Sequence, residues 1–279
     1  MAQPKKAPAQ GGSTLANVST PGQRTHVLVD QVTHQFASGL MAIDRMNFHI
    51  DSGEFVVIVG PSGCGKTTIQ NIIAGLLPVQ RGTVTIAGQP PQAGRKDIAY
   101  MFAQDALLPW RTVIDNVLFG VEIHEGRSVV KEQSWIDAAR GTLASIGLAG
   151  FERTYPRQLS HGMRQRVALA RTFMMKSSLL LMDEPFGALD AHTKLTLEQQ
   201  LLKLWEHSRR TILFITHDLA EAILVADRIL ICSARPGHIK SEVVIGLPRP
   251  RNLNELQESN AYHQIYQRLW SDLSSELWS

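Results

Sequence analysis

Short apolar runs mark the interior of this chain and are separated by segments rich in helix formers. Three runs stand out: Phe55–Val59, Leu179–Met182 and Ile212–Ile215. Because such a run has no polar face, each one predicts a strand that is buried on both sides. Helical segments lie between them, including one that ends near Ala74. This alternation predicts an α/β fold with a mostly parallel central sheet and helices on its faces.

Alternating apolar residues precede the first run. They form two sets separated by a turn around Ser38-Gly39, namely Val27, Val29 and Val32, then Phe48 and Ile50. The pattern predicts short strands, and we expect them to form an N-terminal antiparallel β subdomain.

Residues 106–160 contain no buried run and predict a helical insertion into the α/β core. Within them, one amphipathic stripe recurs at spacings of four, four and three, through Trp135, Ala139, Leu143 and Ile146.

The two ends of the chain differ from its middle. Residues 1–24 hold three prolines and the Gly11-Gly12 pair, and their few bulky apolar side chains cannot offset the ordering entropy. We expect a disordered tail, with a targeting or docking role as the alternative. Residues 25–250 are then one domain, and residues 251–279 a helical extension with one apolar face: Tyr262, Tyr266, Leu269, Leu273 and Leu277.

Composition limits the function classes. The 279 residues carry a net charge of +3 and no run of five Lys or Arg, which argues against nucleic acid as the main partner. Only Cys64 and Cys232 are present, so a reducing cytosol fits better than a disulfide scaffold. No apolar stretch approaches the ~18 residues of a membrane span, and no secretion signal is apparent. Any work at a membrane therefore requires a partner that holds the chain there.

A glycine-rich turn follows the first buried run. It fits the P-loop pattern GxxxxGK[ST] in the sequence Gly60, Pro61, Ser62, Gly63, Cys64, Gly65, Lys66, Thr67, followed by Thr68. Backbone N–H groups and the positive helix end bind a polyphosphate in such a loop. We expect Lys66 to reach the β- and γ-phosphates of ATP and Thr67 to offer its hydroxyl to Mg²⁺. The alternative is a turn that binds nothing.

Two carboxylates end the second buried run. Asp183 and Glu184 are adjacent, and ligands of open α/β sheets bind at the carboxyl ends of strands. If that strand neighbours the strand before the P-loop, Asp183 lies beside the loop. We expect Asp183 to hold Mg²⁺ and Glu184 to act as the base that directs water at the γ-phosphate. The alternative is a pair of solvated turn acids before Pro185.

Leu159-Ser-His-Gly-Met163 resembles the Leu-Ser-Gly-Gly-Gln signature of ABC ATPases. Ser160 is a good N-cap for the helix that follows, and the alternative is an ordinary capped helix. The resemblance implies that Ser160 and Gly162 reach the γ-phosphate bound by a second ATPase subunit, so that ATP lies between two subunits.

Further residues extend the resemblance to ABC ATPases over roughly residues 25–245. Ala188-Leu189-Asp190 resembles the D-loop, and Ile215-Thr-His217-Asp resembles the switch that places His217 near the attacking water. Phe36 stands where the family has an aromatic residue that stacks on adenine; a core Phe is the alternative.

A narrower resemblance is to the nitrate, sulfonate and taurine importer branch. It rests on Leu107–Arg111 with Val113, Asn116-Val117 and Gly120, and on Arg235-Pro-Gly237 with Leu247–Arg251. The branch implies transmembrane permease subunits, a periplasmic binding protein and a place on the cytoplasmic face of the inner membrane. The second ATPase is an identical chain or a relative, and the solute stays open. The alternatives are a soluble non-transport ABC ATPase and an ATP-binding regulatory subunit with impaired hydrolysis.

Two positions depart from the family pattern. Counting back four residues from Leu107 places Ala103 where the family has a Gln that contacts Mg²⁺, and Gln104 comes one residue late. We expect a local shift that lets Gln104 serve; a site without this ligand is the alternative. His161 replaces the first signature Gly, and its ring is expected near the γ-phosphate of the opposite subunit, where it alters turnover.

Overall fold

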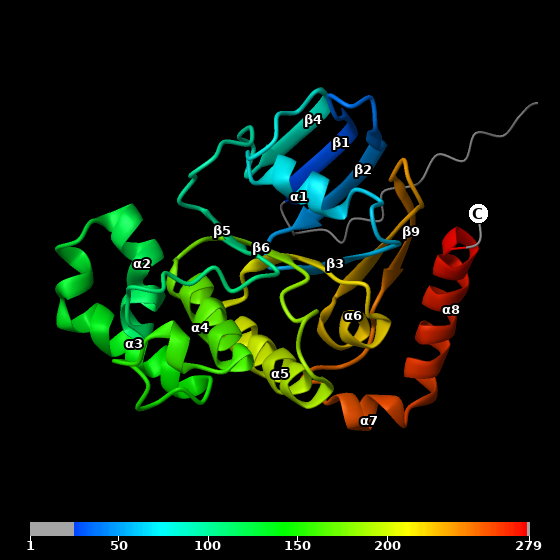
Figure 1. Ribbon diagram of the computed structural model, residues 1–279. Helices are drawn as coiled ribbons and strands as arrows, with labels where there is room; N and C mark the ends of the chain where they lie inside the picture. Colours follow the sequence, from blue (N-terminus) through cyan, green and yellow to red (C-terminus); the bar gives the residue numbers. More distant parts are fainter. Residues whose placement is uncertain (1–24, 278–279) are drawn as a thin grey trace, which may run out of the picture.

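A computed structural model describes residues 25–277, with two sheets and the helices around them (Figure 1). The predicted tail, residues 1–24, lies outside the described residues. No helix of the described part combines the length and apolar character needed to cross a bilayer.

The central sheet has six strands, in the order β5 (Ile98–Met101), β6 (Leu179–Asp183), β7 (Thr211–Ile215), β3 (Phe55–Val59), β8 (Arg228–Cys232) and β9 (Ile239–Val244). Neighbours are parallel except β8 and β9. Every residue of β3 and β7 is buried, which explains their unbroken apolar sequences. The predicted strands and the mostly parallel sheet are confirmed.

A second, antiparallel sheet packs against the P-loop helix, with two strands before that helix in the sequence and one after it. Its order is β2 (Met41–Asp51), β1 (Thr25–Gln35), β4 (Arg81–Ile86). Its inward side chains, such as Val27 and Phe48, pack in one cluster with Ile58 of β3 and Ile69 of α1 (Lys66–Ile73). The antiparallel strands predicted from the alternating pattern are therefore confirmed.

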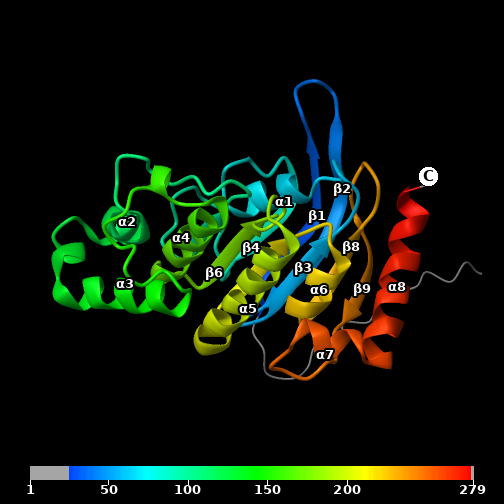
Figure 2. The ribbon, with the colours of Figure 1, turned by 60° about the horizontal axis from the view of Figure 1, so that its bottom comes forward.

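The region predicted to be helical contains α2 (Val113–Glu125) and α3 (Gln133–Ser145), with 3-10 turns at Val129–Lys131 and Pro156–Gln158. Ala139, Leu143 and Ile146 of the predicted stripe are buried against α4 (His161–Met174). Figures 1 and 2 show α2 and α3 at one end of the molecule and the last helix at the other.

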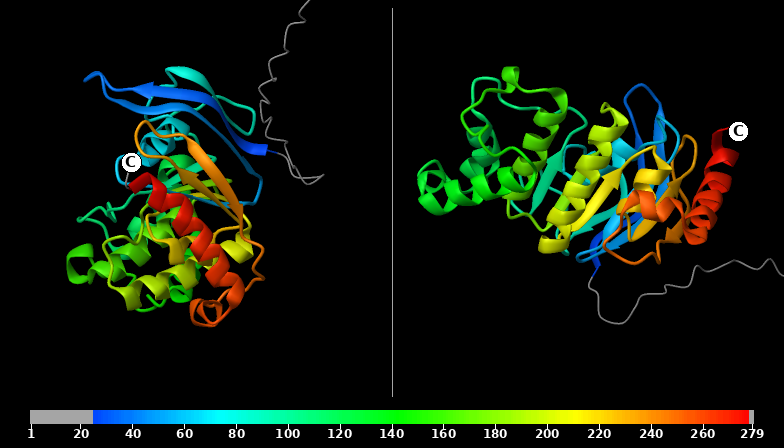
Figure 3. Two further views of the ribbon diagram at one scale, coloured as in Figure 1. Left: turned by 90° about the vertical axis from the view of Figure 1, so that its right-hand side faces the viewer. Right: turned by 90° about the horizontal axis from the view of Figure 1, so that it is seen from below.

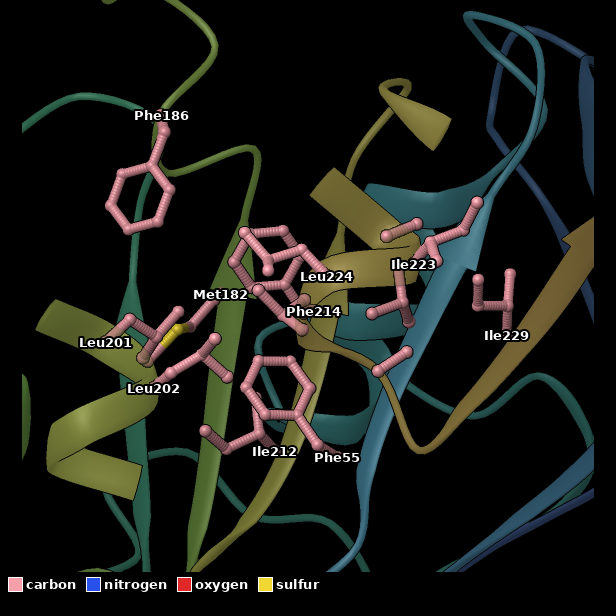
Figure 4. Packing of buried hydrophobic residues seen from close by; sticks show 14 of the residues in the cluster. Phe55, Met182, Phe186, Leu201, Leu202, Ile212, Phe214, Ile223, Leu224 and Ile229 are labelled. Atoms are coloured by element: carbon pink, nitrogen blue, oxygen red, sulfur yellow. The ribbon is translucent and has the colours of Figure 1, made fainter. Parts of the chain in front are cut away.

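The core on the other face of the central sheet is built from α5 (Ala191–Ser208), α6 (Leu219–Val225) and the aromatic rings of the sheet. Figure 4 shows Phe55 and Phe214 between the side chains of these helices. Because β3 and β7 are fixed from both sides, the loops that leave their carboxyl ends start from rigid positions.

The chain ends in α7 (Leu253–Gln257) and α8 (Asn260–Leu277), and α8 lies along the edge formed by β8 and β9 (Figure 3). Tyr262, Leu269 and Leu273 are buried, as predicted. Tyr266 lies on the same side of the helix as Tyr262, with ring centroids 6.0 Å apart, but is 36% exposed. It stands at the margin of the stripe, because steps of four residues drift around a helix of 3.6 residues per turn. The side chain of Leu277 lies outside the described residues.

Candidate functional site

The P-loop, Gly60–Thr67, connects β3 to α1 in a conformation that glycine permits. Gly63 and Gly65 have φ of 77° and 96°, in the left-handed region. A Cβ on Gly60 would lie 2.9 Å from the Cβ of Cys232, and one on Gly65 would lie 2.8 Å from the carbonyl oxygen of Ala42. The loop is thus shaped by close backbone packing, as a cradle for a polyphosphate requires.

Lys66 begins α1 and points back into this loop. Its ammonium donates to the carbonyl oxygens of Gly60 at 2.8 Å and Pro61 at 2.9 Å. The preceding Gly65 provides no side-chain cap, so the first N–H groups of α1 lack a side-chain acceptor at the N-cap. An uncapped helix N-terminus beside a lysine suits an anion.

A surface hollow of about 450 Å³ opens at this point, and we call it the P-loop hollow. Its lining includes most of the predicted site residues: Phe36, Ser62, Gly63, Gly65, Lys66, Thr67, Thr68, Asp183 and Glu184, together with Leu40, Ala42, Ala103 and Arg235. Pro61 and Cys64 contribute loop backbone and do not line it. The structure therefore brings the two sequence-distant motifs together.

Asp183 reaches the P-loop although its strand does not neighbour β3. Strand β7 lies between β6 and β3, so the condition of adjacent strands is not met. Contact comes from α1, which crosses the sheet end: the Thr67 hydroxyl donates to Asp183 Oδ1 at 3.1 Å. Burial, with the neighbouring charge of Glu184, raises the pKa of Asp183. A hydroxyl and a carboxylate at this spacing fit a hard cation such as Mg²⁺.

Glu184 and His217 form a second pair at the same sheet edge. Glu184 Oε2 lies 3.3 Å from His217 Nδ1, and both side chains are exposed. Glu184 has a φ of 44°, and its N–H donates to the carbonyl of Ile215 at 3.0 Å. A left-handed backbone at a non-glycine residue costs energy and is held here by β7. The Glu184 carboxylate can accept a proton, and His217 can hold that carboxylate in position.

Phe36 lies at the turn after β1 with a ring that is 38% exposed. The alternative of a core Phe is therefore wrong. The ring meets His34 edge-on, with centroids 5.0 Å apart, and borders the P-loop hollow. That placement is compatible with stacking on a base, which stays a prediction.

The signature residues line a different cavity, which we call the signature hollow. It measures about 390 Å³ and is lined by Ser160, His161, Gly162, Met163, Arg166, Ala188, Leu189, Asp190 and Thr193. Ser160 is exposed and caps α4, accepting from the N–H of Met163 at 3.3 Å. The D-loop residues Ala188–Asp190 thus lie beside the signature. The two hollows share no lining residue.

His161 occupies the signature hollow without crowding the backbone. Its Nδ1 lies 3.4 Å from a guanidinium nitrogen of Arg164, and its buried Nε2 has no hydrogen-bond partner among the described residues. At Gly162, by contrast, a Cβ would lie 2.6 Å from Thr193 Cγ2. A side chain at the second signature position would therefore displace Thr193, whereas the first position holds a histidine.

Gln104 does not reach the P-loop hollow. Ala103 lines the hollow, and its carbonyl accepts from Gln165 Nε2 at 2.8 Å. Gln104 is exposed and is not among the residues that line the hollow. The metal-ligand role of Gln104 stays a prediction that this geometry does not favour.

Arg235, Leu40 and Ala42 line the P-loop hollow without having been assigned to it from the sequence. Arg235 belongs to the Arg-Pro-Gly segment on which the resemblance to the importer branch rests. The sequence therefore singled out this residue but did not assign it a function.

Cys64 and Cys232 are both free and buried, in agreement with the absence of a disulfide scaffold.

Comparison with known proteins extends these observations. A family model described as ABC transporter matches residues 43–187. The chain is 44% identical over 216 residues to the uncharacterized ABC transporter ATP-binding protein MJ0412 of Methanocaldococcus jannaschii, covering 77% of this chain and 79% of that protein. It is 39% identical over 221 residues to the taurine import ATP-binding protein TauB of Escherichia coli K12, covering 78% and 85%.

The fold has counterparts among solved structures. One is the dimeric structure of a post-hydrolysis state of the ATP-binding cassette MJ0796 bound to ADP and Pi. It has a TM-score of 0.69 and 31% sequence identity, and the match covers 80% of this chain and all of that one. Sequence, fold and site agree: the chain belongs to the ABC transporter family and is one of its ATP-binding, ATP-hydrolysing subunits.

Proposed function

We propose that this ATPase powers a bacterial importer of small anionic solutes and works as a dimer, with a second copy or a close relative. The proposal of a dimer rests on the observation that the P-loop hollow and the signature hollow have no lining residue in common. Each hollow opens at a helix N-terminus, and the two are built from different motifs of one chain. A nucleotide gripped by both therefore requires the P-loop of one subunit and the signature of another.

The proposed chemistry assigns one task to each side chain. Lys66 and the N–H groups of α1 bind the phosphates, and Phe36 receives the base. Ser160 and Gly162 of the second subunit complete the enclosure. Glu184 takes the proton of the attacking water, and His217, at 3.3 Å from it, holds the carboxylate in place. Positioning and electrostatics supply most of the rate in phosphoryl transfer.

Thr67 and Asp183 would hold Mg²⁺, which neutralises phosphate charge when it is bound. The Thr67 hydroxyl oxygen would bind the ion through a lone pair, and Asp183 would bind it as an ionised carboxylate. Because burial raises the pKa of Asp183, a nearby cation favours that ionised form.

The import function is supported by the taurine import relative and by the insertion. Leu108 is fixed at both its N–H and its carbonyl by Asn116, at 2.7 and 3.1 Å. The adjacent Trp110 is 71% exposed. We infer that this rigid, apolar edge receives a cytoplasmic helix of a transmembrane permease, on the cytoplasmic face of the inner membrane. A periplasmic binding protein would deliver the solute to that permease.

The test is ATP hydrolysis by the complete transporter in liposomes. The chain is purified with the permease and binding protein encoded beside it, and phosphate release is measured with taurine, an alkanesulfonate, nitrate and bicarbonate in turn. We expect one of these solutes to raise the rate severalfold, and only when the binding protein is present. Hydrolysis that no solute changes, in a complex that assembles correctly, would contradict the importer proposal.

A further inference from the structure

Arg235 lies directly on the P-loop. Its Nε donates to the carbonyl oxygen of Gly63 at 3.0 Å. Its guanidinium also occupies the place where a side chain on Gly63 would begin, because a Cβ there would lie 2.4 Å from one terminal nitrogen. The side chain is exposed and lines the P-loop hollow beside Phe36 and Leu40.

The loop that carries Arg235 is fixed by its backbone. It connects β8 to β9, and the N–H of Ser233 donates across it to the carbonyl of His238 at 2.9 Å. Gly237 donates to Ala42 at 2.9 Å and accepts from Asp44 at 3.1 Å, which ties the loop to β2. A Cβ on Gly237 would lie 1.8 Å from the carbonyl oxygen of Cys64, so the loop backbone packs against the P-loop itself.

A second anchor comes from the C-terminal helix. The N–H of Ala234 donates to a carboxylate oxygen of Glu276 at 2.9 Å, which fixes the residue immediately before Arg235. The position of the guanidinium thus follows from contacts to β2, the P-loop and α8. Little conformational entropy remains to be lost when Arg235 binds a ligand.

Arg235 also keeps donors available. Only its Nε is engaged, and its terminal nitrogens have no hydrogen-bond acceptor among residues 25–277. The ammonium of Lys66, the other cation that lines the hollow, already donates to two carbonyls of the loop. A planar guanidinium with free donors beside a phosphate-binding loop has the geometry for a bidentate contact to a phosphate group.

We propose that Arg235 is a nucleotide-binding residue that donates to the phosphate groups of the nucleotide in the P-loop hollow. The inference rests on the proposed role of that hollow. Arg235 adds a second cation, beside Lys66, to the lining of a hollow that also includes Asp183 and Glu184. It also transmits the position of α8 to the nucleotide, because the same short loop touches both.

The experiment measures binding of Mg·ADP to the full chain at low and at high salt. We expect Arg235→Gln to weaken binding about tenfold, because a charge-assisted hydrogen bond to phosphate is lost. The salt dependence of binding should also decrease, because salt screens the attraction between the Arg235 charge and the phosphates, which the variant lacks. Arg235→Lys retains the charge and should recover part of the affinity. Arg81→Gln removes an equal charge from an exposed site on β4 outside the hollow and should bind as wild type does.

The outcomes separate this inference from the proposed role of the hollow. If Lys66→Ala abolishes binding and Arg235→Gln binds as tightly as wild type, the inference about Arg235 is overturned and the P-loop role stands. If wild type itself binds no nucleotide, the role of the hollow fails. A variant that loses affinity with unchanged salt dependence and a lower Tm would assign Arg235 a merely structural role and overturn the proposal.

Discussion

The P-loop hollow and the signature hollow are both built at a helix N-terminus, yet they are prepared differently. At α1 the N-cap is Gly65, which contributes no side-chain acceptor, and Lys66 follows at once. At α4 the Ser160 hydroxyl already accepts from Met163, and Asp190 of the same hollow caps α5. Because an uncapped terminus retains its donors, the first hollow can bind an anion alone. At the second hollow one of these donors is already used by the Ser160 hydroxyl.

Removing the Glu184 carboxylate tests the P-loop hollow most severely. We expect Glu184→Gln to lower ATP hydrolysis by about 10²–10³-fold, because the proton acceptor is lost while the phosphate contacts remain. An ATP-bound dimer should then accumulate, visible by size-exclusion chromatography. A variant that hydrolyses ATP at the normal rate would refute the role given to Glu184.

Ser160→Ala should affect only the second hollow. Nucleotide affinity of the isolated chain should stay unchanged, while hydrolysis by the assembled transporter falls about tenfold through loss of a contact to phosphate. Loss of the N-cap should also lower the free energy of unfolding by about 1 kcal/mol. Ser160→Thr, which retains the cap, is the matched control. If the isolated Ser160→Ala variant bound nucleotide more weakly than wild type, the signature hollow would contribute to nucleotide binding by a single chain, and the proposed difference between the two hollows would be wrong.

His161→Gly asks how far the unusual signature side chain tunes turnover. The ring fills part of the signature hollow and leaves Nε2 without a partner among the described residues. We expect a change of a few fold in the hydrolysis rate, because the imidazole lines the hollow at a position where glycine would leave open space. Identical rates for both proteins would exclude a tuning role.

A buried ionic cluster connects the two hollows and gives the smallest expected effect. Lys194 of α5 lies 2.7 Å from Asp218, 3.3 Å from Glu221 and 4.0 Å from Glu198. Glu221 bonds Thr216, the residue before His217. The cluster therefore joins α5, whose N-cap Asp190 lines the signature hollow, to the loop that carries His217, the partner of Glu184.

Three carboxylates share one ammonium in this cluster, and the imbalance of charge favours the protonated form of Glu198 and Glu221. Burial and the charge of Glu221 raise the pKa of Glu198 from 4.5 to about 8. The folded protein then binds more protons than the unfolded chain between these values, so the free energy of unfolding falls as pH rises through that window. Glu198→Gln should flatten this decline in urea denaturation at pH 5.5, 7 and 8.5. An unchanged slope would contradict it.

Local sequence patterns predicted the structural features that depend only on residues close together in the sequence. The strand–glycine–helix order of the P-loop and the apolar runs of β3, β6 and β7 need no distant partner to be recognised. Strand β8 carried no prediction, because its apolar run opens with Arg228. That buried residue is neutralised by Glu54 at 2.7 Å and Glu242 at 2.8 Å, a contact that local sequence does not reveal.

The same limit applies to the site. The position of Asp183 beside Thr67 depends on how α1 crosses β7, and the position of Arg235 depends on contacts to residues about 170 positions earlier. Counting residues placed Ala103 at the position of the family's Gln, and Ala103 does line the hollow, whereas the local shift expected for Gln104 is not seen; the bond from Gln165 that holds Ala103 is a long-range contact. The sequence motifs identified most of the site residues, but contacts between distant parts of the chain determine where these residues lie.

The bond between Ala234 and Glu276 matters for anyone who engineers this protein. Shortening the C-terminal helix to a version without Glu276, as is often done to obtain crystals, would remove one of the anchors of the loop beside the P-loop. Such a trimmed protein would fold around an intact core and still give a distorted nucleotide affinity. Measurements on trimmed and untrimmed versions should therefore not be pooled.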